Sequence, residues 1–311
     1  MQQTSLHLRC TRCNASLGIW RHYVDQYVCA VCGAVYLREN GILDFIGKRE
    51  SSCDDDLAAG QMSSFAIPTT ERSEWEVLSL RLQALFAENH SKSGAGVLKD
   101  APDEGSGVML DIGCGYGGLA ATAAEKFRLV VGVDADLEQL ASASSILGER
   151  FPANLVLIRA WAENLPFMPG QFSAVTCVEA LEHVLNPRAA LVQIRVCLAP
   201  LGRVYLSVPN RFTLRREPHT NLRWIGYLPR GWASHYAARS AKDKELQGVH
   251  FFSASTLSSM LKSAFGDSFE FIRSGCHRSV LGRLAKIAWN MPLLSTVMAY
   301  LVGDLEVIAW N

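Results

Sequence analysis

The segment VMLDIGCGYGG at residues 108–118 places four glycines directly after an apolar run that ends near Asp111. A glycine-rich turn between a strand and a helix lets bare backbone approach a nucleotide-like ligand closely. The apolar segment LVVGVDAD follows, and its Asp134 lies 17 residues after Gly117. An acid at the tip of a second strand is placed to accept hydrogen bonds from ribose hydroxyls.

The motif D-I-G-C-G-Y-G with the later G-V-D resembles the first two motifs of class I S-adenosylmethionine-dependent methyltransferases. The turn differs from the dinucleotide fingerprint G-x-G-x-x-G, and Asp111 before it suits a methionine moiety, which carries an ammonium group. The alternative is a glycine turn that only permits tight packing of strand and helix. The resemblance implies cofactor contacts from Asp111, Gly113, Cys114, Gly115, Gly117, Asp134 and Ala135.

Further cofactor contacts are expected from two later segments. Family members often carry D/E-x-LPF after the third strand, where backbone and acid approach the adenine, and Ala162 and Glu163 occupy that position here. Glu163 is equally well explained as a solvated loop acid. Glu179 ends the fourth strand and is expected beside the methyl donor.

The segment VTCVEALEHV brings Glu179, Glu182 and His183 within five residues. These residues could hydrogen-bond locally at the start of a helix, His183 could act as a general base toward an attacking hydroxyl, or the group could bind a divalent cation. The segment resembles that of O-methyltransferases acting on ubiquinone precursors. It also resembles the E-x-x-E-H segment of small-RNA 2′-O-methyltransferases, which implies magnesium bound with a distant histidine. His250 is the candidate fourth ligand.

Cys10-x2-Cys13 and Cys29-x2-Cys32 are separated by fifteen residues. Two such pairs can supply four thiolates tetrahedrally to one zinc ion, and a segment of this size would need the metal for stability. A redox pair or free thiols are the alternatives. The segment resembles the small zinc ribbons found beside methyltransferases, which implies a structural site.

Alternation of strand and helix patterns predicts a doubly wound α/β, Rossmann-like fold with a seven-stranded sheet. We expect a zinc ribbon over 1–50, a linker and helical cap over 51–107 that includes a helix at 70–88, and a methyltransferase domain over 108–311. The expected strands are 108–112, 129–133, 155–159, 172–178, 203–208, 269–274 and 305–311. The expected helices are 117–127, 136–149 and 187–199.

Two segments of the expected methyltransferase domain have an unusual composition. Residues 209–250 interleave arginines with aromatic residues, which suits a lid over an anionic or sugar-bearing acceptor; a solvated surface is the alternative. Residues 276–304 contain the most apolar stretch, 281–303, which could pack on the core, form an oligomer contact or lie on a membrane surface. Neither segment predicts a transmembrane span.

The 311 residues carry a formal net charge of zero, so no general electrostatic attraction to nucleic acid is expected. The polar start MQQTSLHLRC lacks the apolar core of a signal peptide, and a cytoplasmic protein is expected. The leading hypothesis is O-methylation of a small or lipid-linked metabolite, phenolic or saccharide, with S-adenosylmethionine and structural zinc. The alternatives are a ribosomal-RNA methyltransferase that grips RNA with the ribbon, and a non-catalytic protein that binds a partner.

Overall fold

The computed structural model describes residues 5–21, 23–47, 107–148, 151–213, 216–217, 220–240, 248–272 and 304–311. The expected helix at 70–88, the linker up to residue 106 and the apolar stretch 281–303 lie outside the described residues. No helix among the described residues is long and apolar enough to cross a membrane.

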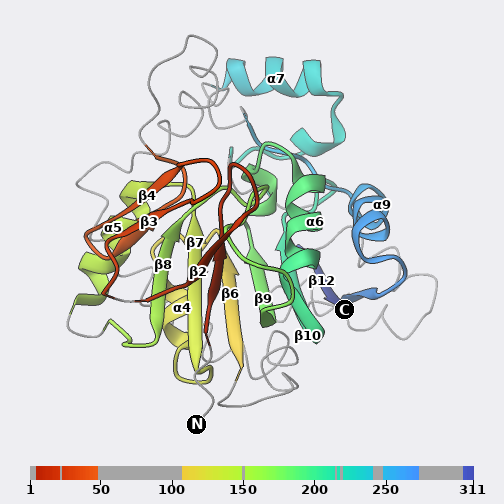
Figure 1. Cartoon of the computed structure of the whole chain (residues 1–311). Helices are drawn as coiled ribbons and strands as arrows, with labels where there is room; N and C mark the ends of the chain where they lie inside the picture. Colours follow the sequence, from red (N-terminus) through yellow and green to blue (C-terminus); the bar gives the residue numbers. More distant parts are fainter. Residues whose placement is uncertain are drawn as a thin grey trace.

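A twisted sheet forms the centre of the molecule (Figure 1). Seven of its strands come from the predicted methyltransferase region and pair in the order β11-β12-β10-β9-β6-β7-β8. These strands are β6 (Val108–Ile112), β7 (Leu129–Asp134), β8 (Leu155–Arg159), β9 (Phe172–Val178), β10 (Leu198–Val208), β11 (Phe269–Ile272) and β12 (Leu305–Trp310). Of these seven strands, only β12 runs antiparallel to its two neighbours, so this part of the sheet ends in the expected hairpin-like pair. The predicted seven-stranded, doubly wound sheet is confirmed.

Two layers of helices cover the sheet. One layer holds α4 (Gly118–Ala123) and α5 (Leu137–Leu147). The other holds α6 (Pro187–Cys197) and α9 (Ala254–Phe265). Alternate residues of β6 point to opposite layers: Leu110 packs in the core cluster that holds α6 and α9, whereas Met109 packs with α4 and α5. Both faces of the parallel strands are therefore buried, as in other doubly wound sheets.

Local sequence signals set the ends of these helices. Asp136 caps α5 by accepting hydrogen bonds from the backbone of Glu138 and Gln139, and Asn186 caps α6 ahead of Pro187. Ser253 caps α9 in a reciprocal pair with Thr256. Since each cap lies at the carboxyl-terminal edge of the sheet or in the segment leading from it, the caps fix the loops in which a ligand would bind.

The N-terminal segment does not fold apart from the sheet. Its strands are β1 (His7–Arg9), β2 (Ser16–Ile19), β3 (Gln26–Val28), β4 (Val35–Glu39) and β5 (Ile42–Asp44). β5 pairs in parallel with β8 through Leu43 and Ile158, and β4 and β3 follow, so the sheet has ten strands. Leu8, Tyr36 and Leu43 belong to the same core cluster as the α6 side of the sheet. Strands β3, β4 and β5 of the expected ribbon thus extend the edge of the main sheet (Figure 1), whereas β1 and β2 pair only with each other in a separate two-stranded sheet.

The described part of the expected lid contains η4 (Ile225–Tyr227), a single turn of 3-10 helix, and α7 (Arg230–Arg239). Helix α7 stands beyond one end of the sheet (Figure 1) and buries only Ala233 and Ala237. Trp232 on the same helix is 72% exposed. Helix α7 therefore presents the aromatic side chain of Trp232 to solvent and packs through Ala233 and Ala237 against Ile225 of η4.

Candidate functional site

The glycine turn lies between the end of β6 and the start of α4, as the sequence predicts. Gly113, Gly115 and Gly117 adopt φ angles of 69°, 51° and 74°. A side chain at Gly113 would lie 2.2 Å from the Cβ of Ala180. This position therefore requires glycine both for its backbone conformation and for the close approach of the loop after β9.

Asp134 holds this turn in place. Its Oδ2 accepts a hydrogen bond of 2.9 Å from the backbone of Gly115, and its Oδ1 accepts one of 2.9 Å from Asp136. A carboxylate oxygen can accept more than one hydrogen bond, so both oxygens keep capacity for hydroxyl donors. Burial raises the pKa of this carboxyl, and the two backbone donors oppose that rise.

Asp111 is the most unusual polar residue of the site. It is 2% exposed, and its Oδ1 accepts a 2.7 Å hydrogen bond from the hydroxyl of Thr176. Its Oδ2 is buried with no hydrogen-bond partner among the described residues. Burial raises its pKa to about 7, and Asp134 adds to the rise while Thr176 opposes it. A buried carboxyl with one unused oxygen fits a ligand that brings a positive charge.

Other predicted cofactor contacts serve the scaffold. A side chain at Gly132 would lie 2.9 Å from the Sγ of Cys114, so this buried thiol packs against β7. The backbone oxygen of Ala135 accepts a hydrogen bond of 3.1 Å from Arg159. Ala162 is buried, and Glu163 accepts a 3.0 Å hydrogen bond from the backbone of Asn186, the cap of α6. Glu163 thereby links the loop after β8 to the loop after β9.

The acidic cluster after β9 separates into different environments. Glu179 and His183 are exposed, whereas Glu182 is 1% exposed. Glu182 and His183 differ in exposure because both lie in η3 (Leu181–His183). A 3-10 turn has about three residues per turn, so it directs successive side chains to different sides. Burial raises the pKa of the Cys177 thiol, and the carboxyls of Glu182 and Asp111 add to that rise. Glu182 thus lies on the inner side of the site, near the strand end that carries the predicted cofactor residue Asp111.

Glu179 has a φ of 50°, in the left-handed region that non-glycine residues rarely adopt. This conformation costs about 1–2 kcal/mol for a residue with a side chain. Its backbone N–H donates to the carbonyl of Ser207 on β10, 2.9 Å away, which holds the strained residue at the carboxyl ends of two adjacent strands. Such strain is concentrated at functional sites, and here it lies next to Ala180 and the glycine turn.

His250 is brought to the same region, as the sequence predicts. Its backbone N–H donates to the carbonyl of Glu182 over 2.8 Å. The ligand atoms of Glu179, Glu182, His183 and His250 nevertheless do not come close enough in this structure to share an ion, and magnesium at these residues stays a prediction. Within the described ranges, only the four N-terminal cysteines bring three or more ligand atoms together closely enough to share an ion.

The four cysteines Cys10, Cys13, Cys29 and Cys32 have all their sulfur atoms within 4.8 Å of one another. Their two turns have the same geometry. The N–H of Asn14 bonds to the carbonyl of Cys10 and that of Gly33 to the carbonyl of Cys29, each over 2.9 Å. Asn14 and Gly33 both have a positive φ, at 63° and 72°. Two equivalent turns therefore present two thiols each to one point.

Sequence reasoning missed several contacts that shape the site. Thr176 shows no signal of its role within the apolar strand β9, and its partnership with Asp111 depends on the pairing of β9 with β6. Asn164 and Arg9 join the loop after β8 to the first cysteine turn. Long-range pairs of this kind leave no local pattern in the chain.

Comparison with known proteins agrees with this geometry. A family profile described as a methyltransferase domain matches residues 79–264. The chain is 36% identical over 148 residues to a ubiquinone biosynthesis O-methyltransferase of Dechloromonas aromatica, which covers 44% of this chain and 60% of that protein. It is 38% identical over 114 residues to the protein of the same name from Pseudomonas fluorescens, covering 33% and 44%. The chain thus spans 60% or less of these two relatives.

A solved S-adenosylmethionine-dependent methyltransferase from Mesorhizobium loti is similar over 69% of this chain and 95% of its own, with 19% identity and a TM-score of 0.47. The family profile covers more than half of the chain and includes the glycine turn, Asp134 and the loop after β9. The chain therefore belongs to the methyltransferase-domain family.

Proposed function

We propose that this protein transfers a methyl group from S-adenosylmethionine to a hydroxyl group of a small metabolite. The observation that carries the proposal is the buried carboxyl of Asp111 with its unused Oδ2, beside a glycine turn too close to Ala180 to admit a side chain. Family membership and the names of the similar ubiquinone biosynthesis O-methyltransferases support this reaction.

The residues present fit this cofactor. Asp111 offers a buried carboxyl to the ammonium group of the methionine part, and Asp134 offers acceptor capacity to the ribose hydroxyls. The glycine turn provides backbone that can approach the ligand closely, and the buried Ala162 occupies the position at which the sequence motif predicts an adenine contact. When bound, S-adenosylmethionine supplies a methyl group on a positively charged sulfur that is already activated for transfer.

The protein's part in the reaction is to hold and deprotonate the acceptor. His183 is exposed at the end of η3, and a histidine there can accept the proton of an attacking hydroxyl. Glu179 is held at the strand ends by its bond to Ser207, where an exposed carboxylate can orient the acceptor. Glu182 is buried and supports the backbone of His250, so its role is to position this segment.

We infer further that the four cysteines form a structural zinc site. Cys10 and Cys32 have sulfurs 3.6 Å apart, and those of Cys13 and Cys29 are 3.5 Å apart. A tetrahedral ion with Zn–S bonds of about 2.3 Å would place its sulfurs about 3.8 Å apart. The hydroxyl of Tyr36 lies 3.0 Å from the Sγ of Cys10 and can donate a hydrogen bond to a thiolate. Four thiolates fill the coordination sphere of a tetrahedral zinc ion, so the ion would have no open position for catalysis.

Calorimetric titration with S-adenosylmethionine tests the proposal directly. The wild-type protein should bind one equivalent, and Asp111→Ala should weaken binding at least about tenfold because a charge-assisted contact is lost. The absence of binding to the zinc-loaded wild type would refute the proposed reaction.

Methylation of a panel of catechols, phenols and sugars would then identify the acceptor, and salt-dependent retention of RNA would favour the alternative RNA substrate.

A further inference from the structure

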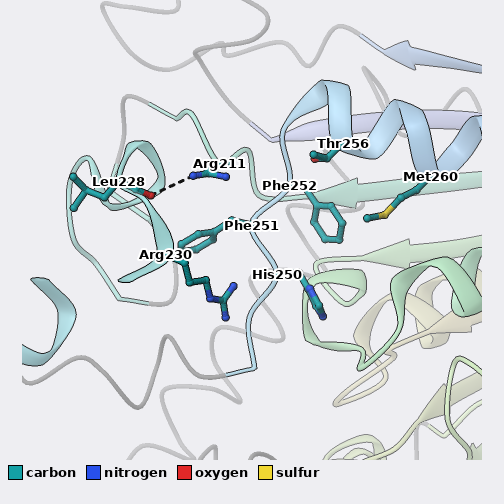
Figure 2. Close-up of a pocket in the computed structure, with 8 residues that line it drawn as sticks. All are labelled: Arg211, Leu228, Arg230, His250, Phe251, Phe252, Thr256 and Met260. Atoms are coloured by element: carbon teal, nitrogen blue, oxygen red, sulfur yellow. Dashed lines mark hydrogen bonds between the residues drawn. The ribbon is translucent and has the colours of Figure 1, made fainter. Parts of the chain in front are cut away.

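A cavity of about 210 Å³ lies between the lid and the start of α9 (Figure 2). Eight residues line it: Arg211, Leu228, Arg230, His250, Phe251, Phe252, Thr256 and Met260. Two of these residues are arginines and none is acidic. The cavity therefore combines a positive wall with an aromatic and aliphatic one.

Both arginines are fixed by backbone carbonyls of the lid. Arg211 donates through Nη2 to Leu228 over 3.2 Å and through Nε to Gly226. Gly226 lies so close to the backbone of Arg211 that a side chain there would meet the Arg211 oxygen at 1.9 Å. Arg230 donates through Nη1 to the carbonyl of Val249 over 3.1 Å. The cavity thus has its cations placed before any ligand arrives.

These contacts leave the charge of the arginines uncompensated. The partners are neutral carbonyls, and no carboxylate among the described residues pairs with Arg211 or Arg230. Each guanidinium has five N–H donors, of which Arg211 uses two and Arg230 one in these bonds. The remaining donors suit a phosphate or carboxylate, which guanidinium groups bind through paired hydrogen bonds.

Figure 2 shows lining side chains on both sides of the extended segment 250–252. The Phe251 ring lies on the same side as both arginines, whereas His250 and Phe252 point to the other side. The backbone N–H of His250 bonds to the carbonyl of Glu182, and that of Arg211 bonds to the carbonyl of Phe252. The cavity is therefore tied to the loops that follow β9 and β10, where the proposed methyl transfer takes place.

We propose that this cavity binds an anionic group of the methyl acceptor, a phosphate ester or a carboxylate, through Arg211 and Arg230. The ring or chain next to that group packs on Phe251. This inference rests on the proposed function and specifies the acceptor as an anionic molecule with an apolar part.

Binding of three small probes tests the inference in the zinc-loaded full chain. Phenyl phosphate and benzoate carry the two anionic groups, and benzyl alcohol is the neutral control of similar size. At least one anion should bind at least about tenfold more tightly than benzyl alcohol, since charge-assisted bonds to guanidinium are gained. Preference for phenyl phosphate would identify a phosphate ester, and preference for benzoate a carboxylate.

Variants on the same lid locate the site. Arg230→Gln should weaken anion binding at least about tenfold. Arg239→Gln, at the other end of α7, should change it by less than about twofold, because an exposed charge at a distance is screened. Both residues are exposed, so these changes should leave the thermal midpoint nearly unchanged. Equal loss in both variants, or equal binding of anions and benzyl alcohol, would overturn the inference.

S-adenosylhomocysteine titrated into the same samples separates this inference from the proposed reaction. If S-adenosylhomocysteine does not bind while phenyl phosphate binds through Arg230, the methyltransferase proposal fails and the anion site remains. If S-adenosylhomocysteine binds and neither anion does, the anion site is refuted while the proposed reaction stands.

Discussion

The side-chain amide of Asn164 donates a hydrogen bond of 2.7 Å to the backbone oxygen of Thr11, between the first two candidate zinc ligands. The neighbouring Arg9 makes two more bonds to the same loop, from its backbone to Pro166 over 3.0 Å and from its Nε to Leu165 over 2.9 Å. The loop that carries Ala162 and Glu163 is therefore held by the cysteine turn from the outside. This coupling leads to the first two predictions.

Replacing Asn164 with alanine should weaken S-adenosylmethionine binding about fivefold. The change removes a hydrogen bond worth about 1 kcal/mol between the cysteine turn and the proposed adenine loop. Asn154→Ala is the matched control, because Asn154 bonds to Ala124 and Phe127 and lies at the start of β8 rather than at its end. Calorimetry should show normal affinity in this control even if its melting temperature falls. Equal affinities for Asn164→Ala and wild type would contradict the coupling.

Removing zinc should also weaken S-adenosylmethionine binding, by at least about fivefold or about 1 kcal/mol. Without the ion, the turns at Cys10 and Cys29 lose their common ligand, and the hydrogen bonds that join Arg9 and Thr11 to the proposed adenine loop lose their support. The measurement compares chelated protein, untreated protein and chelated protein with zinc restored. Metal analysis should find about one zinc per chain, and zinc retained by Cys29→Ser would argue against the four-thiolate site.

The contact between the cysteine turn and the loop after β8 could not be predicted from the sequence, although the cysteine cluster and the strands could. The cysteine spacing and the seven strands each leave a local pattern, and both predictions describe the structure well. The pairing of β5 with β8 depends on Leu43 meeting Ile158, residues more than a hundred positions apart, which no periodicity encodes. The sequence therefore predicts a separate ribbon, whereas in the structure β3, β4 and β5 of that segment continue the main sheet.

In the candidate site, too, local motifs predict some positions, whereas contacts between distant residues decide others. The strand ends and the glycine turn follow from short motifs, so Asp111, Asp134 and Glu179 lie where the sequence predicts. Whether Glu182 faces solvent or the interior depends on the orientation of a single 3-10 turn, and the carbonyl of Glu182 bonds to His250, a residue far along the chain. Phe251 and Met260 enter a cavity only because the lid folds back on α9.

Gly113→Ala should abolish detectable S-adenosylmethionine binding or unfold the loop after β9, because the new methyl group would lie 2.2 Å from Ala180. Gly170→Ala is the matched control. Gly170 has a similar φ of 74°, but its surroundings leave open space for a side chain. Both variants carry backbone strain of about 1–2 kcal/mol, and only the first has a clash. Equal affinities in the two variants would show that the contact with Ala180 is irrelevant to binding.

The raised pKa of Asp111 predicts a pH dependence of stability in the ligand-free protein. Burial favours the protonated carboxyl in the folded state, so its contribution is fully present below pH 3.8 and is lost as the pH rises through about 7. Asp111→Asn should therefore be more stable than wild type near pH 8, by up to about 4 kcal/mol, and lose this advantage near pH 4. Urea unfolding at several pH values measures the difference. A constant difference from pH 4 to 8 would contradict the raised pKa.

His183→Ala should reduce kcat at least about a hundredfold, since general bases contribute about that much or more, while S-adenosylmethionine affinity stays within about twofold. His235→Ala is the control, because His235 is an exposed histidine of α7 with no assigned role in proton transfer. The residual rate of His183→Ala should increase with pH as the acceptor hydroxyl ionises without help. Full activity after chelation with zinc alone restored would exclude magnesium at Glu179, Glu182, His183 and His250. Unchanged kcat in His183→Ala would remove His183 from catalysis and leave the strained Glu179 as the remaining candidate for contact with the acceptor.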